Sequence, residues 1–276
     1  MKKIIAVVLT LALFFSMSAC SFDLFGFLKR GIDNLPADEA MAQVSENMKK
    51  VKGFKMEGTL DFTISAADIS TGIQAEYETA QIKDPQQFHL NMKMDMSILG
   101  KGMQEIEVYS FADGDGYTVY ERVGDEWGKR YSEHYAADVY LDSTAYINDV
   151  LSYEMLGKER MNGVDTLHYS GKVSKDKITD IIRGSGMMMI FLNLFNTDLL
   201  EQEGLEDVIL DVWVSEKENL PVRVTIDMTQ FFKSFFESPN FKAGITAEKA
   251  EMTFDISDYN AVPEIVLPEE ARNTQW

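Results

Sequence analysis

The sequence has very few of the side chains on which metal-dependent and disulfide chemistry depends. It contains one cysteine and three histidines, His89, His134 and His168, and none of the histidines stands in a His-Glu-x-x-His spacing. One cysteine cannot form an intramolecular disulfide, and so small a donor set gives zinc no complete ligand shell. We therefore expect neither a disulfide framework nor a metal centre.

Sequence motifs of the common enzyme classes are also missing. Gly184-Ser185-Gly186 lacks the Gly-Lys-Ser/Thr ending of a phosphate-binding loop, and no Gly-x-Ser-x-Gly elbow occurs. Carboxylates are so numerous that any two could be named a catalytic pair, so their abundance gives no evidence for a catalytic site. The sequence predicts a protein that is not an enzyme and that has no cofactor, with a hydrolase built from scattered carboxylates as an alternative.

Positive charge is scarce. The chain has 26 Lys and Arg residues against 45 Asp and Glu residues, a formal net charge of −19, and its basic residues form no cluster. Binding to a phosphate backbone needs a basic patch, so nucleic acid is excluded as a partner. The same charge opposes adsorption to anionic lipid, so attachment to a membrane must depend on something else.

The N-terminus has the order of a secretory signal peptide. Lys2 and Lys3 precede an apolar run from Ile4 to Phe15, and the small-residue tract Ser16 to Ala19 follows. The apolar run is shorter than the roughly 18 to 20 residues that span a bilayer. We therefore expect a cleaved signal and not a transmembrane helix.

Met17-Ser18-Ala19-Cys20 resembles the bacterial lipobox, in which signal peptidase cuts before a cysteine whose sulfur carries a diacylglycerol, although Leu is commoner at the position of Met17. We expect 1–19 to be a lipoprotein signal peptide, Cys20 to be lipidated, and 20–34 to tether the protein to the extracytoplasmic face of the cell membrane. Two or three acyl chains make such an anchor stable. The alternative is an ordinary secretory signal with Cys20 as a free thiol.

Residues 35–276 contain no domain-breaking linker and no repeat of fixed period, so we expect one domain and a monomer. Period-two alternation, clearest from Phe54 to Ile64 and from Phe88 to Ile98, predicts half-buried antiparallel strands. Further strands are expected at 73–77, 164–173, 208–214, 222–228 and 250–256, and helices at 35–53, 136–156 and 174–200. About nine strands with helices inserted between them favour an α+β fold, a curved antiparallel sheet with helices on its concave side.

Asp113-Gly114-Asp115-Gly116 resembles the start of a calcium loop. The third acidic position and the closing Glu of an EF-hand are absent, so a hairpin turn is the better interpretation.

Apolar residues exceed what the strands alone require. Met187 to Phe195 and Phe231 to Phe236 are strongly apolar, and the chain has 16 methionines. A buried core helix explains these runs without any function, but methionine also adapts to apolar guests of variable shape. The hypothesis of a hydrophobic ligand site names Leu60, Phe62, Met92, Met94, Met96, Met188, Phe191, Phe195, Phe232 and Phe235.

Several stretches resemble the LolA/LolB and LppX/LprG-like group, and most of all uncharacterised Gram-positive lipoproteins of that fold. They are the tract around Cys20, Val51 to Gly58, Gly163 to Tyr169, Val212 to Arg223 and Pro268 to Ala271. The resemblance implies a half-barrel of about eleven strands, closed on one side by helices, which in several relatives holds acyl chains.

The leading hypothesis is a membrane-anchored, non-enzymatic lipoprotein that binds a lipid or another apolar small molecule on the concave face of its sheet. The alternative is a module whose cavity is filled by its own side chains and which binds another envelope protein through its acidic surface.

Overall fold

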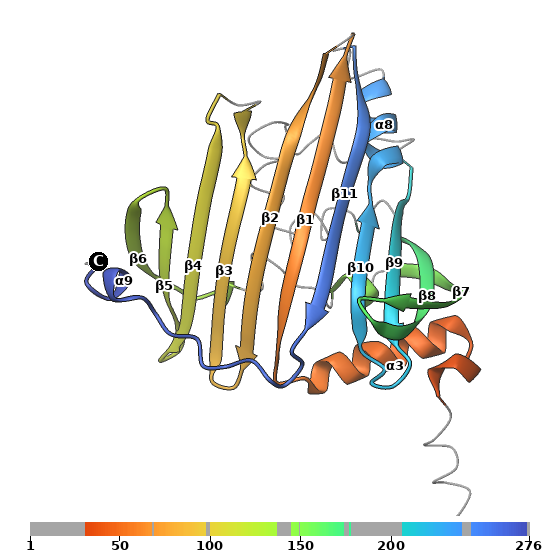
Figure 1. Ribbon diagram of the computed structural model, residues 1–276, viewed down its shortest axis with the longest axis horizontal. Helices are drawn as coiled ribbons and strands as arrows, with labels where there is room; N and C mark the ends of the chain where they lie inside the picture. The colour runs from red at the N-terminus through yellow and green to blue at the C-terminus, as the bar shows by residue number, and fades with distance from the viewer. Residues whose placement is uncertain are drawn as a thin grey trace, which may run out of the picture.

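The computed structural model describes residues 31–274 except 68, 98–99, 137–144, 149, 174–176, 178–205 and 239–243. Within these ranges the chain forms an eleven-stranded antiparallel sheet in the order β6-β5-β4-β3-β2-β1-β11-β10-β9-β8-β7 (Figure 1). The strands are β1 Gly53–Ala66, β2 Ile69–Lys83, β3 Gln86–Asp95, β4 Met103–Asp113, β5 Gly116–Val123, β6 Glu126–Ser132, β7 Val150–Met161, β8 Val164–Val173, β9 Val208–Ser215, β10 Pro221–Asp227 and β11 Ile245–Ser257. The expected α+β half-barrel with a curved, unclosed sheet is confirmed.

Two meanders make up this sheet. The strands β1 to β6 follow one another in space as in sequence, as do β7 to β11, and β1 joins the two sets by pairing with β11. Cross-strand partners share a face, so the register aligns Leu60 with Met252 on one side and with Ala75 on the other. The apolar alternation of separate segments thus becomes one continuous inner face.

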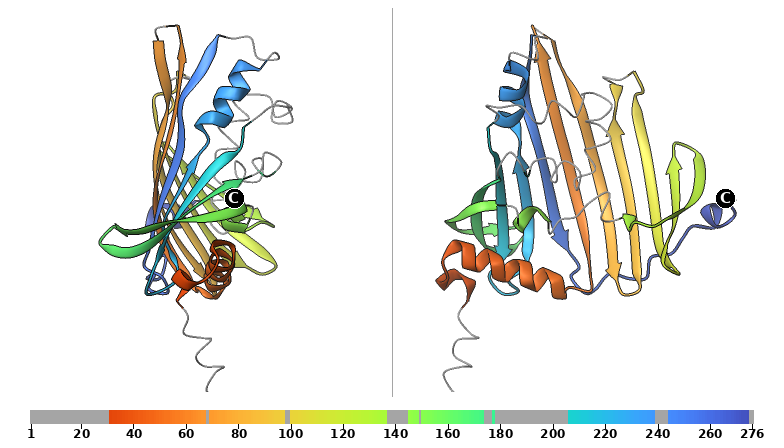
Figure 2. Two further views of the ribbon diagram at one scale, coloured as in Figure 1. Left: turned by 90° about the vertical axis from the view of Figure 1, so that its right-hand side faces the viewer. Right: turned by 180° about the vertical axis from the view of Figure 1, so that it is seen from behind.

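The described helices are η1 Ile32–Asn34, α3 Ala37–Lys50, α5 Ala145–Asn148, α8 Thr229–Glu237 and α9 Glu269–Arg272. Viewed edge-on, α3 and α8 lie on the same side of the sheet (Figure 2). In α8 the ring of Phe232 meets that of Phe62 on β1 edge to face, with centroids 5.0 Å apart, so this side is the inner one. Helices therefore cover the concave face, as expected.

Close packing on the inner face explains one glycine in the middle of a strand. Gly58 on β1 lies between Tyr77 on β2 and Phe254 on β11, whose ring centroids are 5.7 Å apart. A Cβ atom at position 58 would lie 2.2 Å from the Tyr77 ring. Glycine is required here because an aromatic ring occupies the place of its side chain.

The turn at Asp113-Gly114-Asp115-Gly116 joins β4 to β5, and Gly114 takes a φ of +61°. The Asp113 carboxylate accepts a hydrogen bond of 2.6 Å from the Thr118 hydroxyl. The predicted hairpin turn is confirmed.

One sequence expectation needs correction. The helix expected at 136–156 is wrong from Val150 onward, where β7 begins. β7 is an edge strand with two irregularities in its pairing to β8, and both of its faces carry exposed residues. Its alternation is therefore weak, and the loose apolar spacing resembled a helix. The helix expected at 174–200 lies almost entirely outside the described residues.

Candidate functional site

One row of apolar side chains on the inner face remains accessible. Met92 on β3 pairs with Ile106 on β4, which pairs with Val123 on β5. Met92 and Ile106 are half-buried, and Val123 is 51% exposed. The next inner row, Leu90 and Val108, is buried. Exposed apolar area next to a packed core is what an apolar ligand would cover.

The structure brings several of the predicted ligand-binding residues together. Leu60 and Met94 share one inner row with Ala75 between them, and both are buried. Met92 and Met96 are half-buried and pack against the core. These methionines thus lie at the boundary between the packed core and the accessible row.

The other predicted ligand residues divide into two groups. Phe62, Phe232 and Phe235 are buried where α8 packs on the sheet. At 0% exposure, Phe232 and Phe235 leave no room for a ligand beside them in this structure, so their role in binding stays a prediction. The remaining predicted residues, Met188, Phe191, Phe195 and the lipidation site Cys20, lie outside the described residues.

Ile106 and Val123 were missed at the sequence level. Ile106 alternates with the polar residues of β4, and Val123 directly precedes the Gly124 turn. In the sequence, neither residue differs from an ordinary apolar residue of a strand or strand end. Only the register shows that they continue the row of Met92.

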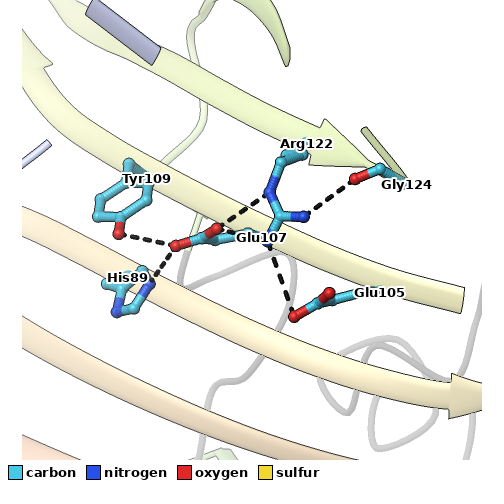
Figure 3. Close-up of polar contacts among 6 residues, drawn as sticks. All are labelled: His89, Glu105, Glu107, Tyr109, Arg122 and Gly124. Atoms are coloured by element: carbon cyan, nitrogen blue, oxygen red, sulfur yellow. Dashed lines mark hydrogen bonds and ion pairs between the residues drawn. The ribbon is translucent and has the colours of Figure 1, made fainter. Parts of the chain in front are cut away.

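The outer face carries a hydrogen-bonded network centred on Glu107 of β4 (Figure 3). Its carboxylate accepts bonds from the Tyr109 hydroxyl at 2.8 Å and from the Arg122 guanidinium at 2.8 and 3.1 Å, and His89 Nε2 lies 3.3 Å away. Burial would raise the pKa of Glu107, but the bonds from Arg122, Tyr109 and His89 outweigh it and lower that pKa. The network links β3, β4 and β5 through charge-assisted hydrogen bonds.

A similar arrangement links β7, β8 and β9. His168 stacks on Trp213 with ring centroids 4.2 Å apart, and its nitrogens lie 2.9 Å from Glu159 and 3.2 Å from Asp211. The Trp213 indole also donates to Glu159 at 3.1 Å. Both His89 and His168 are therefore hydrogen-bonded residues of the polar face. Across the described ranges, no three His, Cys, Asp or Glu side chains converge to hold a metal ion.

No helix in the described part of the chain is long and apolar enough to cross a membrane.

Among solved structures, the chain is similar to LprF from Mycobacterium bovis, with 14% identity over 85% of this chain and 97% of that one, at a TM-score of 0.51. This likeness confirms the fold that the LolA/LolB and LppX/LprG-like resemblance implied. Weaker likenesses are to the lipoprotein LppX of Mycobacterium tuberculosis, with 12% identity over 83% and 98% and a TM-score of 0.48, and to a LolA superfamily protein of Nitrosomonas europaea, with 12% identity over 86% and 96% and a TM-score of 0.21.

None of the curated proteins matches this sequence. A family model covers nearly the whole folded region, from residue 36 to residue 275, and the chain therefore belongs to the family of unknown function DUF6612.

Proposed function

We propose that this protein is a non-enzymatic lipoprotein, anchored through Cys20 on the extracytoplasmic face of the cell membrane, that binds a lipid or another apolar molecule on the concave face of its sheet. The observation that carries the proposal is the accessible row of Met92, Ile106 and Val123 beside an otherwise packed inner face.

The binding free energy would come from burial of apolar surface. Covering a few hundred Å² at about 25 cal/mol per Å² supplies several kcal/mol before the entropic cost of association. Met92 and Met96 suit this role, because flexible thioether side chains adapt to acyl chains of different length and unsaturation. Fold likeness supports the proposal only at the level of architecture, since one fold hosts many functions.

In-cell photocrosslinking tests this function on the intact, lipidated protein. A benzophenone side chain placed at Ile106 should form adducts with membrane lipids, identified by mass spectrometry of the purified protein. The matched control carries the same side chain at Glu105, the preceding residue, which points to the outer face. Equal lipid labelling at both positions, or none at Ile106, would refute a concave-face site.

A second function is supported by the burial of the inner face elsewhere. Over β9, β10 and β11 the inner side chains of Leu210, Ile226 and Met252 are at most 1% exposed, so this half of the sheet is filled by the protein itself. An envelope module that binds a partner protein through its acidic surface would need no cavity. In that case the Ile106 probe should capture no lipid, and the probe at Glu105 on the outer face should capture protein.

A further inference from the structure

The inner face of the sheet changes from apolar to charged at its β5–β6 end. In the pairing of β1 to β4 and of β9 to β11, the inner positions carry uncharged side chains, except for Lys83 at the end of β2, whose ammonium donates to the Met48 carbonyl of α3. On β5 and β6, charged residues alternate with apolar ones on that same face: Glu121 is the partner of Gly128, Arg130 of Val119 and Glu126 of Val123. The accessible apolar row therefore ends directly against charged side chains.

A glycine opens space among these charges. Gly128 lies on the inner face between Glu126 and Arg130, and a Cβ atom added to it would meet only the carbonyl oxygen of Glu121, at 3.8 Å. A recess of about 370 Å³ lies here, and its lining includes Glu121, Glu126, Arg130 and the apolar Val123. The recess and the apolar row thus share Val123 as a common wall.

The charges in the recess are of both signs, and Arg130 and Glu121 pair only weakly. Glu121 and Glu126 supply two carboxylates and Arg130 a guanidinium on the inner face, whereas Lys129 lies on the outer face over the Tyr120 ring. The Arg130 and Glu121 side chains are 51% and 33% exposed, and the Nε and Oε2 atoms that pair them are 3.9 Å apart. So long and exposed an ion pair contributes little to stability, so a ligand can replace each partner at small cost.

We infer that this recess is a head-group subsite for a zwitterionic phospholipid, with Arg130 on the phosphate and Glu121 on the amine, while the acyl chains cover Met92 and Ile106. The inference rests on the proposed function and adds to it the class of lipid. Arginine presents a planar set of donors that fits phosphate oxygens, and a carboxylate accepts from an ammonium group. A head group with negative charge alone would be attracted by Arg130 but repelled by Glu121 and Glu126.

The test compares the lipids captured at Ile106 in the full-length, lipidated protein. With the benzophenone probe at Ile106, zwitterionic phospholipids should be enriched over the total lipid extract of the same cells. Arg130→Gln should lower the ratio of phospholipid to diacylglycerol among the adducts about tenfold, since it removes a charge-assisted contact. Glu121→Gln should instead lower the ratio of zwitterionic to anionic phospholipid, by roughly fivefold or more. The control variant Lys93→Gln, on the outer face of β3, should change neither ratio.

The outcomes separate this inference from the function on which it rests. Lipid adducts whose composition equals that of the extract, or whose composition is unchanged by both recess variants, would overturn the head-group subsite and leave apolar binding in place. An absence of lipid adducts in every variant would overturn both. A fall in the ratio of phospholipid to diacylglycerol in Arg130→Gln, together with a fall in the ratio of zwitterionic to anionic phospholipid in Glu121→Gln, would support a subsite that binds both charges of the head group.

Discussion

Glu107 joins three strands through a single carboxylate, and replacing it by glutamine should destabilise the sheet measurably. The wild-type side chain is 16% exposed and accepts two bonds from Arg122 and one from Tyr109. Glutamine is nearly isosteric, but its NH₂ group must face one of these donors, and the charge is lost. Hydrogen bonds to charged groups contribute about 1.5 to 3 kcal/mol, so we expect Glu107→Gln to cost about 2 kcal/mol.

Urea denaturation followed by circular dichroism measures this cost. The matched control is Glu105→Gln on the same strand and the same face, where the carboxylate is 41% exposed and reaches Arg122 only at 3.7 Å. An exposed pair of that geometry contributes about 0 to 1 kcal/mol, so the control should move the free energy of unfolding by less than about 0.5 kcal/mol. Equal losses in the two variants would refute the assignment of a structural role to Glu107.

The difference between Glu107→Gln and the wild type should also depend on pH. The folded protein lowers the pKa of Glu107, so the native carboxyl releases its proton more readily than the unfolded one. The resulting stabilisation is present above the unfolded pKa, near 4.3 for Glu, and is lost as pH falls through the lower native pKa. The two proteins should therefore differ at pH 7 and converge in acid, whereas a gap that persists at pH 2 would contradict this origin.

Three further outcomes are expected. Cys20→Ala should abolish incorporation of an alkyne-labelled fatty acid and release the protein from membranes, as read by fluorescence gels and fractionation. Met92→Lys should keep the fold within about 1 kcal/mol because its ammonium can reach solvent, whereas Met94→Lys should cost about 3 kcal/mol or more by burying an unpaired charge, as read by thermal unfolding. Gly58→Ala should cost about 1 to 3 kcal/mol through its clash with a neighbouring ring, while Gly128→Ala, which meets open space, should be nearly neutral.

The sequence predicted the strands whose two faces differ sharply. The alternation from Phe54 to Ile64 lies within β1, and the alternation that starts at Phe88 begins in β3. The helix expected at 35–53 is α3, two residues shorter at its start and three residues shorter at its end. It could not predict β7, because an edge strand exposed on both sides has no strong apolar period.

The candidate site was predictable only in part, since a periodicity assigns a face but does not say what covers it. Met92 and Met94 follow one pattern, yet the first is half-buried and the second buried. The Glu107 network could not be predicted from the sequence either. His89 and Arg122 are 33 residues apart, and only the register of β3, β4 and β5 places them around one carboxylate. Contacts that depend on register cannot be inferred from separate strands.

Two features of the sheet explain why a ligand site can lie over β3 to β5. The helices α3 and α8 lie toward the half of the sheet that holds β7 to β11, where α8 packs on β11 and β9 and α3 packs on β7 (Figure 2). Their packing cannot hold β3, β4 and β5 together, and an accessible inner row adds little stability of its own. The Glu107 network supplies that cohesion from the opposite face, because it ties the same three strands by charge-assisted bonds. The accessible row of Met92, Ile106 and Val123 can therefore be apolar without being needed for packing, while Leu90 and Val108 beside it remain part of the core.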